Sequence, residues 1–355
     1  MNPVPTTTVS FDVLERFCIQ TIERMGVRQE DRAIFADVLL QGTLRAVPAQ
    51  GQGVQQLPTY YQRIQRGVIR LAAELEIVNL SGAIALVDAH DGLGSVMGAR
   101  AMDLALDIAG EQGIGAVGIR HSTHFGIAAY YAMRALQHGC IGLAFSNAGP
   151  EIAPWGGTQA VVGTNPWAVA IPAGQELPVV LDMANSTSGK GMIGRFLREH
   201  LPIPDDWALT ADGERTTDAT QGMAGTLFPL GGPKGYAMAV IVDALTGVLT
   251  GSAYGASCFG ETRQDVGNMM IAIDVSRFMP IDTFKERMDA FIQEIRSSTR
   301  ATGVDAIYLP GEMEYRRVEE RRAHGVPFET GRLADLRELG TRLNVPTELA
   351  GAMAS

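Results

Sequence analysis

The chain has 355 residues, of which 46% are apolar and 19% charged, and it carries a formal net charge of −10. This composition is typical of a globular protein, and the acidic balance excludes the basic surface that nucleic-acid binding requires. No uncharged apolar run of about 18 residues and no signal-peptide pattern occurs, so we expect no membrane association. Cys18, Cys140 and Cys258 are far apart. They predict reduced thiols and a cytoplasmic location, not disulfides or a metal site.

Hydrophobic periodicity predicts the elements in chain order. Ser10 is the expected N-cap of the first helix. The predicted helices cover residues 11–25, 29–45, 57–66, 95–112, 125 onward, 234–251 and 282–299, and the charged tail 312–348. The predicted strands form a hairpin over 75–90, a strand over 115–120, several strands between 140 and 185, and a strand over 268–278.

This order predicts an α/β (α+β) fold with a central mixed β domain flanked by helices. Residues 1–72 form the predicted N-terminal helical region, which we expect to pack with the C-terminal helices of 279–355. Residues 73–278 form the predicted central α/β domain.

The stretch Gly113-Ile-Gly115-Ala-Val-Gly118 matches the dinucleotide-binding fingerprint in its letters. That fingerprint needs a strand before the glycines and a helix after them, so that the helix N-terminus faces the pyrophosphate. Here a helix precedes the glycines and a strand follows them. We therefore predict a helix-to-strand turn, with glycine supplying positive φ, and a non-Rossmann fold.

His121 and His124 lie in the stretch RHSTHFGIAAYY, just before a predicted helix. If Ser122 or Thr123 caps that helix, His124 lies in its first turn, where the helix dipole disfavours a positive charge. A neutral imidazole there can exchange a proton with a carbonyl or hydroxyl group. Metal ligation and an ordinary polar turn are the alternatives that this stretch leaves open.

Polar side chains recur at the ends of the predicted apolar strands in the middle of the chain. Asn165, Asp182 and Lys234 stand in the motifs GTNP, LDMANS and PLGGPKGY. Buried polar groups need partners, and a bound polar ligand is one way to supply them. With the histidine stretch and PWGG at 154–157, these make five such motifs within about 120 residues, which favours a ligand site over a set of unrelated turns.

Several of these motifs together resemble the type-2 malate/L-lactate dehydrogenase family. They are HSTHFGIAAYYA, IAPWGGTQAVVGTNPWAVAIP, LDMANSTSGKGMI, IPDDWALTADGERTTD, PLGGPKGYAMAVIVDALTGVLTG and IYLPGE. The family includes ureidoglycolate and sulfolactate dehydrogenases, diketogulonate reductase and piperideine-2-carboxylate reductase. The resemblance implies a non-Rossmann fold that binds NAD or NADP in its central domain. It also implies a homodimer and hydride transfer to or from a small 2-oxo, 2-hydroxy or imino acid.

The resemblance also implies roles for individual residues. His124 is the expected catalytic acid–base group or nicotinamide neighbour. The cofactor contacts that it implies are His124, Ala148, Asp182, Met183, Ala184, Lys234, Gly311 and Glu312. Residues expected at the substrate are Gln52, Gln56, His121, Thr164 and Asn165.

The chain departs from the family near its N-terminus. The family segment D-S-H-G-V-x-R-L-x-x-Y supplies a proton-donating histidine and a carboxylate-binding arginine, but here the stretch reads QGQGVQQLPTYY. Gly51, Gln52 and Gln56 replace the serine, the histidine and the arginine. Glutamine cannot donate a proton near neutral pH and cannot bind a carboxylate as a bidentate cation. A substrate that lacks a free carboxylate is therefore less disfavoured, and His124 is the simplest remaining acid–base group.

Three functions remain open from the sequence. The first is an NAD(P)-dependent oxidoreductase with altered substrate choice. The others are a non-redox enzyme that reuses the pocket, such as an isomerase, lyase or hydrolase, and a catalytically silent nucleotide-binding protein. The sequence does not distinguish NAD from NADP.

Overall fold

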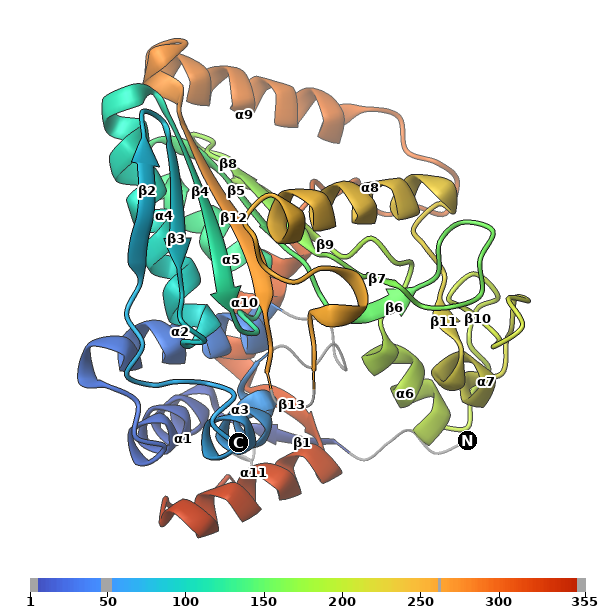
Figure 1. Ribbon diagram of the computed structural model, residues 1–355. Helices are drawn as coiled ribbons and strands as arrows, with labels where there is room; N and C mark the ends of the chain where they lie inside the picture. Colours follow the sequence, from blue (N-terminus) through green and yellow to red (C-terminus); the bar gives the residue numbers. More distant parts are fainter. Residues whose placement is uncertain (1–5, 46–52, 261–262, 350–355) are drawn as a thin grey trace.

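The computed structural model describes residues 6–45, 53–260 and 263–349. A seven-stranded mixed sheet forms its centre (Figure 1). In spatial order the strands are β2 (Glu76–Ser81), β3 (Ile84–Asp88), β4 (Ile114–Ser122), β12 (Val266–Asp274), β5 (Cys140–Ser146), β8 (Trp167–Ile171) and β9 (Val179–Met183). The pair β3–β4 is parallel, and the other neighbours run antiparallel.

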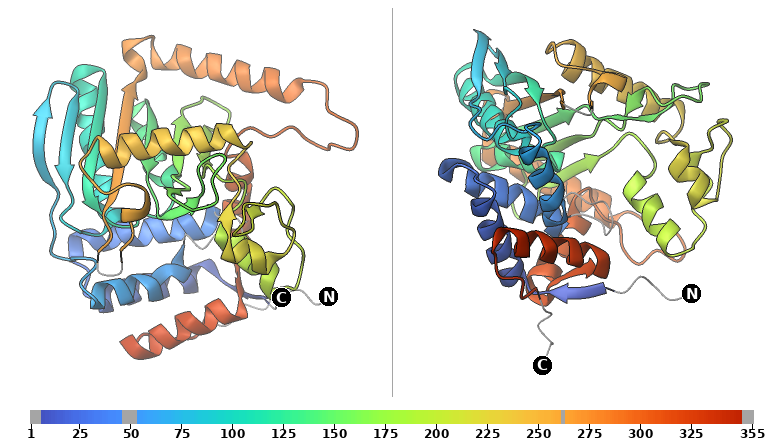
Figure 2. Two further views of the ribbon diagram at one scale, coloured as in Figure 1. Left: turned by 45° about the vertical axis from the view of Figure 1, so that its right-hand side comes forward. Right: turned by 60° about the horizontal axis from the view of Figure 1, so that its bottom comes forward.

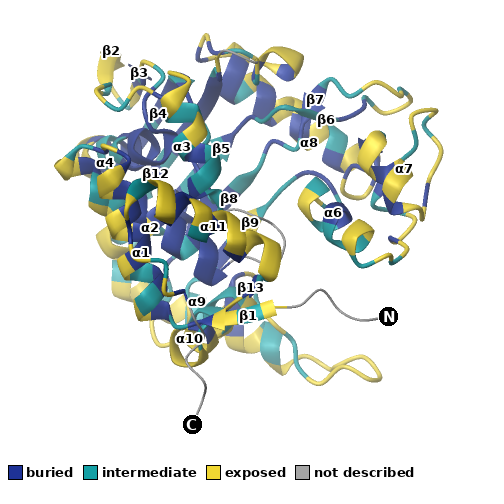
Figure 3. Cartoon of the chain, turned by 90° about the horizontal axis from the view of Figure 1, so that it is seen from below, coloured by how far each residue is buried: buried dark blue, intermediate teal, exposed yellow. Residues whose placement is uncertain are grey.

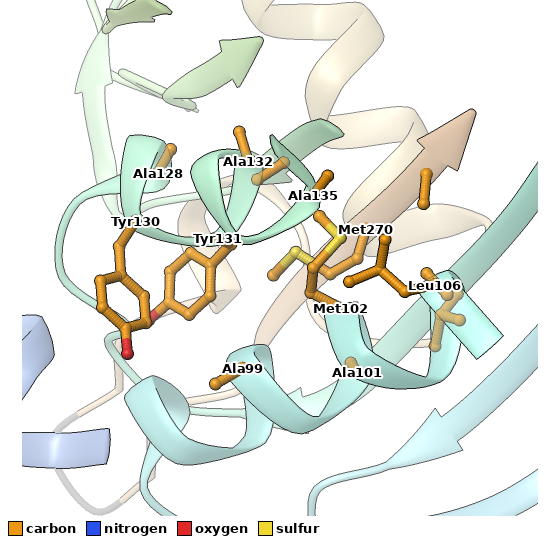
Figure 4. Packing of buried hydrophobic residues seen from close by; sticks show 14 of the residues in the cluster. Ala99, Ala101, Met102, Leu106, Ala128, Tyr130, Tyr131, Ala132, Ala135 and Met270 are labelled. Atoms are coloured by element: carbon orange, nitrogen blue, oxygen red, sulfur yellow. The ribbon is translucent and has the colours of Figure 1, made fainter. Parts of the chain in front are cut away.

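Two helices cover one face of this sheet and bury the main core against it. They are α4 (Gly94–Gln112) and α5 (Ala128–Arg134). They approach closely because alanines line much of their contact, while Tyr131, Met102 and Met270 fill the remaining space (Figure 4). Gly115 on β4 is also required to be small, because a Cβ there would lie 2.1 Å from the carbonyl oxygen of Ala105.

A second core joins the two ends of the chain. Its helices are α1 (Phe11–Arg24), α2 (Gln29–Arg45), α3 (Leu57–Gln65), α10 (Glu312–His324) and α11 (Thr330–Leu343). The strands β1 (Thr6–Val9) and β13 (Val326–Glu329) pair antiparallel beside them, as Figure 2 shows from below. Residues from both termini therefore share one set of buried side chains.

A smaller subdomain lies beyond the β9 edge of the sheet. It contains the four-stranded sheet β10 (Ala208–Leu209), β11 (Thr226–Leu227), β6 (Pro150–Ile152) and β7 (Val162–Gly163), with helices α6 (Lys190–Arg198) and α7 (Ala219–Ala224). The helix α8 (Pro233–Asp243) continues into a π-helical turn, Ala244–Val248. The helix α9 (Ile281–Ser297) crosses the top of the molecule in Figure 1. Across the described ranges, none of the helices is both long and apolar enough to cross a bilayer.

Most of the predicted elements are confirmed, and two predictions are wrong. The tail is not helical throughout, because β13 interrupts it between α10 and α11. The helix after His124 begins at Ala128, so His124 precedes it and does not lie in its first turn. The Gly113 turn is confirmed: Gly113 ends α4 with φ of +87° and leads directly into β4.

Candidate active site

His124 is bound to Tyr60, which α3 holds beneath the end of β4. The Tyr60 hydroxyl oxygen lies 2.7 Å from Nδ1 of His124 and 3.3 Å from the carbonyl oxygen of the same residue. A hydroxyl has one proton, so both contacts are hydrogen bonds only if Nδ1–H donates to the hydroxyl oxygen and the hydroxyl donates to the carbonyl. We assign this tautomer, which leaves the lone pair of the neutral ring on Nε2.

The imidazole of His124 is neutral at physiological pH. Burial, together with the positive charge of Arg63, lowers its pKa from 6.5 to about 4. Tyr60 is 1% exposed, and burial raises its pKa above the ordinary range, so the phenol keeps its proton. A neutral histidine with a free Nε2, held in place by a neutral tyrosine, is the arrangement of a general base.

The carboxylate of Asp182 accepts a hydrogen bond from the first turn of α5, a contact that no local sequence pattern predicts. Its Oδ2 accepts a hydrogen bond of 3.0 Å from the backbone nitrogen of Ala129, one residue into α5. This bond joins the end of β9 to the turn that begins at His124. Although solvent reaches the residue, burial of the carboxyl raises its pKa to about 6, against the opposing effects of the Ala129 bond and of Arg45.

We expect the Asp182→Asn variant to be the more stable protein at neutral pH. The unfolded carboxyl has a pKa of about 3.9, whereas the folded one has a pKa of about 6. Ionisation therefore destabilises the wild-type fold progressively as the pH rises from about 4 to about 6. Asparagine still accepts from Ala129 but does not ionise. Urea unfolding from pH 4 to 8 should show that the variant's advantage in free energy of unfolding grows over this interval and then stays constant. A difference between the two proteins that does not change with pH would contradict the raised pKa.

Asn165 joins three segments around the predicted cofactor site. Its Oδ1 accepts from the Ala148 nitrogen at 2.9 Å, and its Nδ2 donates to the Ala239 carbonyl at 2.8 Å. Its carbonyl accepts from Nδ2 of Asn185 at 2.6 Å, and the Thr164 carbonyl accepts from the Asn185 nitrogen at 2.8 Å. Both ends of the Asn165 amide are therefore bonded within the fold. Substrate contacts of Thr164 and Asn165 stay predictions.

The Gly311 turn packs directly on the strand that carries Asp182. The Val180 nitrogen donates to the Pro310 carbonyl at 2.9 Å, and a Cβ at Gly311 would lie 2.8 Å from the Val180 carbonyl oxygen. Glu312 is buried, and its Oε2 closes the turn by accepting from the Leu309 nitrogen at 3.0 Å. Met183 and Ala184 follow at the end of β9, so the predicted contacts 182–184 and 311–312 come together.

The Lys234 segment reaches the same place through Asn185. The Leu230 nitrogen donates to the Asn185 carbonyl at 2.9 Å, and α8 begins three residues later with exposed Lys234 in its first turn. Nearby, the Ser186 hydroxyl is buried without a hydrogen-bond partner within the described part of the chain. The positive end of a helix dipole, a lysine and an unpaired hydroxyl are groups that bind phosphate. The residues present therefore fit the anionic part of a dinucleotide.

Of the other predicted substrate residues, His121 is bonded to Asp88, Gln56 precedes α3, and Gln52 is not described. Nδ1 of His121 is bound to Oδ2 of Asp88 at 2.9 Å, in an ion cluster with Arg120 on the β3–β4 side of the sheet. A substrate role for His121 stays a prediction. Gln56 ends the short turn that precedes α3, and Gln52 lies outside the described residues.

Sequence reasoning missed Arg63 and Gln264. With its amide oxygen turned toward Arg63, Gln264 accepts from Nε and Nη2 at 3.2 and 3.1 Å. In the opposite orientation of the amide, its oxygen accepts a 3.3 Å hydrogen bond from the backbone nitrogen of His124, so Gln264 lies between Arg63 and His124 and its oxygen bonds to one of them. A helical signal for Arg63 exists, because Gln56, Tyr60 and Arg63 follow an i, i+4, i+7 spacing. Gln264 precedes β12 and has no local signal.

A non-Rossmann α/β fold, a phosphate-compatible set of side chains around β9 and a neutral histidine together point to a nicotinamide-dependent oxidoreductase. The family model of malate/L-lactate dehydrogenase matches residues 9–337, and the chain belongs to this family. Two relatives carry their cofactor in their names: a (2R)-3-sulfolactate dehydrogenase (NADP(+)) of Chromohalobacter salexigens and a ureidoglycolate dehydrogenase (NAD(+)) of Escherichia coli.

Individual relatives cover nearly the whole chain. The malate dehydrogenase of Pyrococcus horikoshii is 35% identical over 344 residues, 94% of this chain and 95% of its own. The L-sulfolactate dehydrogenase of Methanothermobacter thermautotrophicus is 33% identical over 93% of this chain and 95% of its own. The crystal structure of malate dehydrogenase from Entamoeba histolytica superposes with a TM-score of 0.92 at 29% identity, covering 96% of this chain and 99% of that one. These names give no support to a non-redox activity.

Proposed function

We propose that the chain transfers a hydride between NAD or NADP and C2 of a small 2-hydroxy or 2-oxo acid, with His124 as the acid–base residue. The bonded pair of Tyr60 and His124 carries this proposal, because it leaves Nε2 of a neutral ring free to take a proton. The relatives named for malate and sulfolactate support the substrate class. A related substrate without a free carboxylate is the second candidate, supported by Gln56 in place of the family arginine.

In the oxidation direction, Nε2 of His124 accepts the proton of the substrate hydroxyl while the hydride leaves C2. The nicotinamide, when bound, accepts that hydride. Tyr60 keeps the ring oriented, since its hydroxyl accepts from Nδ1–H throughout. In reduction the imidazolium returns the proton to the carbonyl oxygen, so hydride and proton balance in both directions.

The cofactor is held, in this proposal, by the contiguous segments around β9. Lys234 and the first turn of α8 face its phosphates, together with the Ser186 hydroxyl. Asp182 and the Gly311 turn flank the path from these groups toward His124. This arrangement would place the phosphates at the start of a helix without the strand–glycine–helix order of a Rossmann fold.

Nicotinamide absorbance tests the proposal directly. Purified protein is mixed with NAD or NADP and L-malate or sulfolactate, and in the reverse direction with NADH or NADPH and the corresponding 2-oxo acids. The matched panel replaces each acid with its amide or ester. Reduction of a 2-oxo acid supports the proposal; turnover of amides or esters alone supports the second candidate. Tight NADH binding without turnover of either panel would contradict both.

We further propose a homodimer that buries the outer face of α8 and its π-helical extension. This face exposes large apolar side chains, among them Ile241 at 56%, Val248 at 60% and Leu249 at 66%. A contiguous apolar surface of this kind marks an association site. A second copy of the chain presents the same apolar face, which a two-fold axis would bring against the first.

The double variant Ile241→Asp/Val248→Asp should convert the protein to a monomer in light-scattering chromatography. Facing aspartates would have to lose water across the interface, which costs far more than the apolar contact gains. Phe278→Asp, at a more exposed apolar position outside α8 and its extension, is the control and should stay dimeric. A double variant that remains a dimer would place the interface elsewhere.

A cytoplasmic location is proposed on the three cysteines. Cys18, Cys140 and Cys258 are all free and buried. Free thiols persist where the surroundings are reducing. Cell fractionation of the native host should therefore place the protein in the cytoplasmic fraction.

A further inference from the structure

Arg63 is a half-buried cation, and none of the acidic residues that the structure describes is paired with it. Its side chain forms no ion pair with any residue in the described ranges, and its one polar partner is the neutral amide of Gln264. Burial lowers the pKa of its guanidinium, which shows that the surrounding protein disfavours the charge. A buried charge is expensive unless an opposite charge accompanies it. An anion that arrives with a ligand would supply that charge.

Arg63 stands beside the acid–base pair. It follows Tyr60 by three residues on α3, and this spacing places both side chains on the same face of the helix. Gln264 contacts the Arg63 guanidinium at one end of its amide and approaches the His124 backbone at the other. Arg63 is also close enough to His124 for its charge to act on the imidazole. The Arg63 cation therefore lies next to the pair of Tyr60 and His124.

We infer that Arg63 binds the carboxylate of the substrate, in the role that the family arginine would have at position 56. This inference rests on the proposed function and narrows its substrate to a 2-oxo or 2-hydroxy acid that keeps its carboxylate. Gln56, at the start of α3, shares a helical face with Tyr60 and Arg63. The proposed carboxylate-binding arginine therefore lies two helical turns beyond the family position, on the same side of the helix. A guanidinium binds a carboxylate through two parallel N–H···O bonds, which also fixes the direction of C2.

The same arrangement couples substrate binding to the protonation of His124. The Arg63 charge lowers the pKa of His124, and a carboxylate bound to Arg63 offsets that charge. Binding a 2-oxo acid therefore shifts His124 toward the protonated form that reduction requires. A neutral substrate produces no such shift.

Oxamate, an unreactive isostere of a 2-oxo acid, tests the inference without turnover. Wild type, Arg63→Gln and the control Arg66→Gln are titrated with oxamate in the presence of saturating NADH, and binding is followed by nicotinamide fluorescence. Arg66 is exposed at the end of the same helix and serves as the matched charge loss. We expect Arg63→Gln to weaken oxamate binding about 100-fold, the effect of removing one partner of a desolvated charge pair. Arg66→Gln should bind as wild type does.

Oxamate affinity that is unchanged in Arg63→Gln, or absent in wild type, would overturn the inference. The NADH affinity and thermal stability of each variant show whether Arg63→Gln remains folded. If Arg63→Gln does not fold, Arg63→Lys replaces it in the titration and should keep part of the affinity for oxamate. A second readout is the pH profile of turnover. Removing the Arg63 charge should raise the pKa of His124, so the acid-side fall in the rate of oxidation should move to higher pH. Wild type that binds NADH and oxamate but never transfers a hydride would contradict the proposed function and leave the Arg63 clamp supported.

Discussion

Replacing His124 by glutamine should lower kcat/KM about 1,000-fold in both directions, within the range that positioned acid–base groups contribute. Glutamine fits the space and can still bond to Tyr60, but it cannot carry a proton between states. NADH binding should change little, and steady-state kinetics with a fluorescence titration separates the two effects. The control is His324→Gln, an exposed histidine at the end of α10. Near-wild-type turnover in His124→Gln would show that water or the substrate supplies the proton.

The pH dependence of the wild type provides a second check on His124. A base must be unprotonated, and the pKa of this imidazole is about 4 in the free protein. We therefore expect kcat/KM for oxidation to stay level through pH 6.5 and to fall only as the pH approaches about 4. A limb centred near 6.5 would mean that the ring is solvated, contrary to its buried bond with Tyr60.

Gly94→Ala should destabilise the fold by about 3 kcal/mol, at the upper end of the cost of overpacking, and should also reduce turnover. A Cβ at this first residue of α4 would lie 2.0 Å from the carbonyl oxygen of Thr123 and 2.8 Å from that of His124. These are backbone atoms, so they cannot rotate away as a side chain can. Relief requires α4 to separate from the His124 segment, which disturbs the carbonyl that Tyr60 contacts.

Gly110→Ala is the matched control on the same helix. A Cβ there meets nothing within 4 Å. Alanine should stabilise the helix by about 0.5–1 kcal/mol, because glycine loses more backbone entropy on folding. Urea unfolding of both variants measures the two effects, and equal stabilities would show that α4 can shift freely at its start.

The helices could be predicted from sequence because each buries one stripe whose spacing is local information. The strand β13 could not, since its partner β1 lies more than 300 residues away, with Thr6 opposite Glu329, and nothing in the tail itself marks the interruption. The start of α5 was misplaced for the same reason. Ser122 and Thr123 looked like local caps, but the partner of the helix start is Asp182, 53 residues further along the chain. Thr123 instead accepts from the Gly94 nitrogen at 3.0 Å and so serves α4.

Part of the candidate site could likewise be predicted from the sequence, and part of it depends on the three-dimensional fold. Motif resemblance pointed to Asp182, Lys234 and Gly311, and the structure places their segments in one continuous series of contacts around β9. Motif resemblance could not show that Arg63 has no acidic partner among the residues that the structure places, because the pairing of a side chain depends on its three-dimensional surroundings. Burial, which sets the pKa of His124, likewise depends on residues from distant parts of the chain.

The pairing of β1 with β13 also determines when the protein can finish folding. During synthesis the helices α1, α2 and α3 leave the ribosome first, but the side chains of α11 and β13 that complete their core are made last. Apolar positions such as Leu14 and Phe35, fully buried in the finished protein, stay without those partners while the intervening sheet is translated. Contacts of such long sequence separation form slowly. In the folded protein these side chains lie in a buried core (Figure 3). In the unfinished chain they stay exposed, and exposed apolar surface of this kind is what chaperones bind.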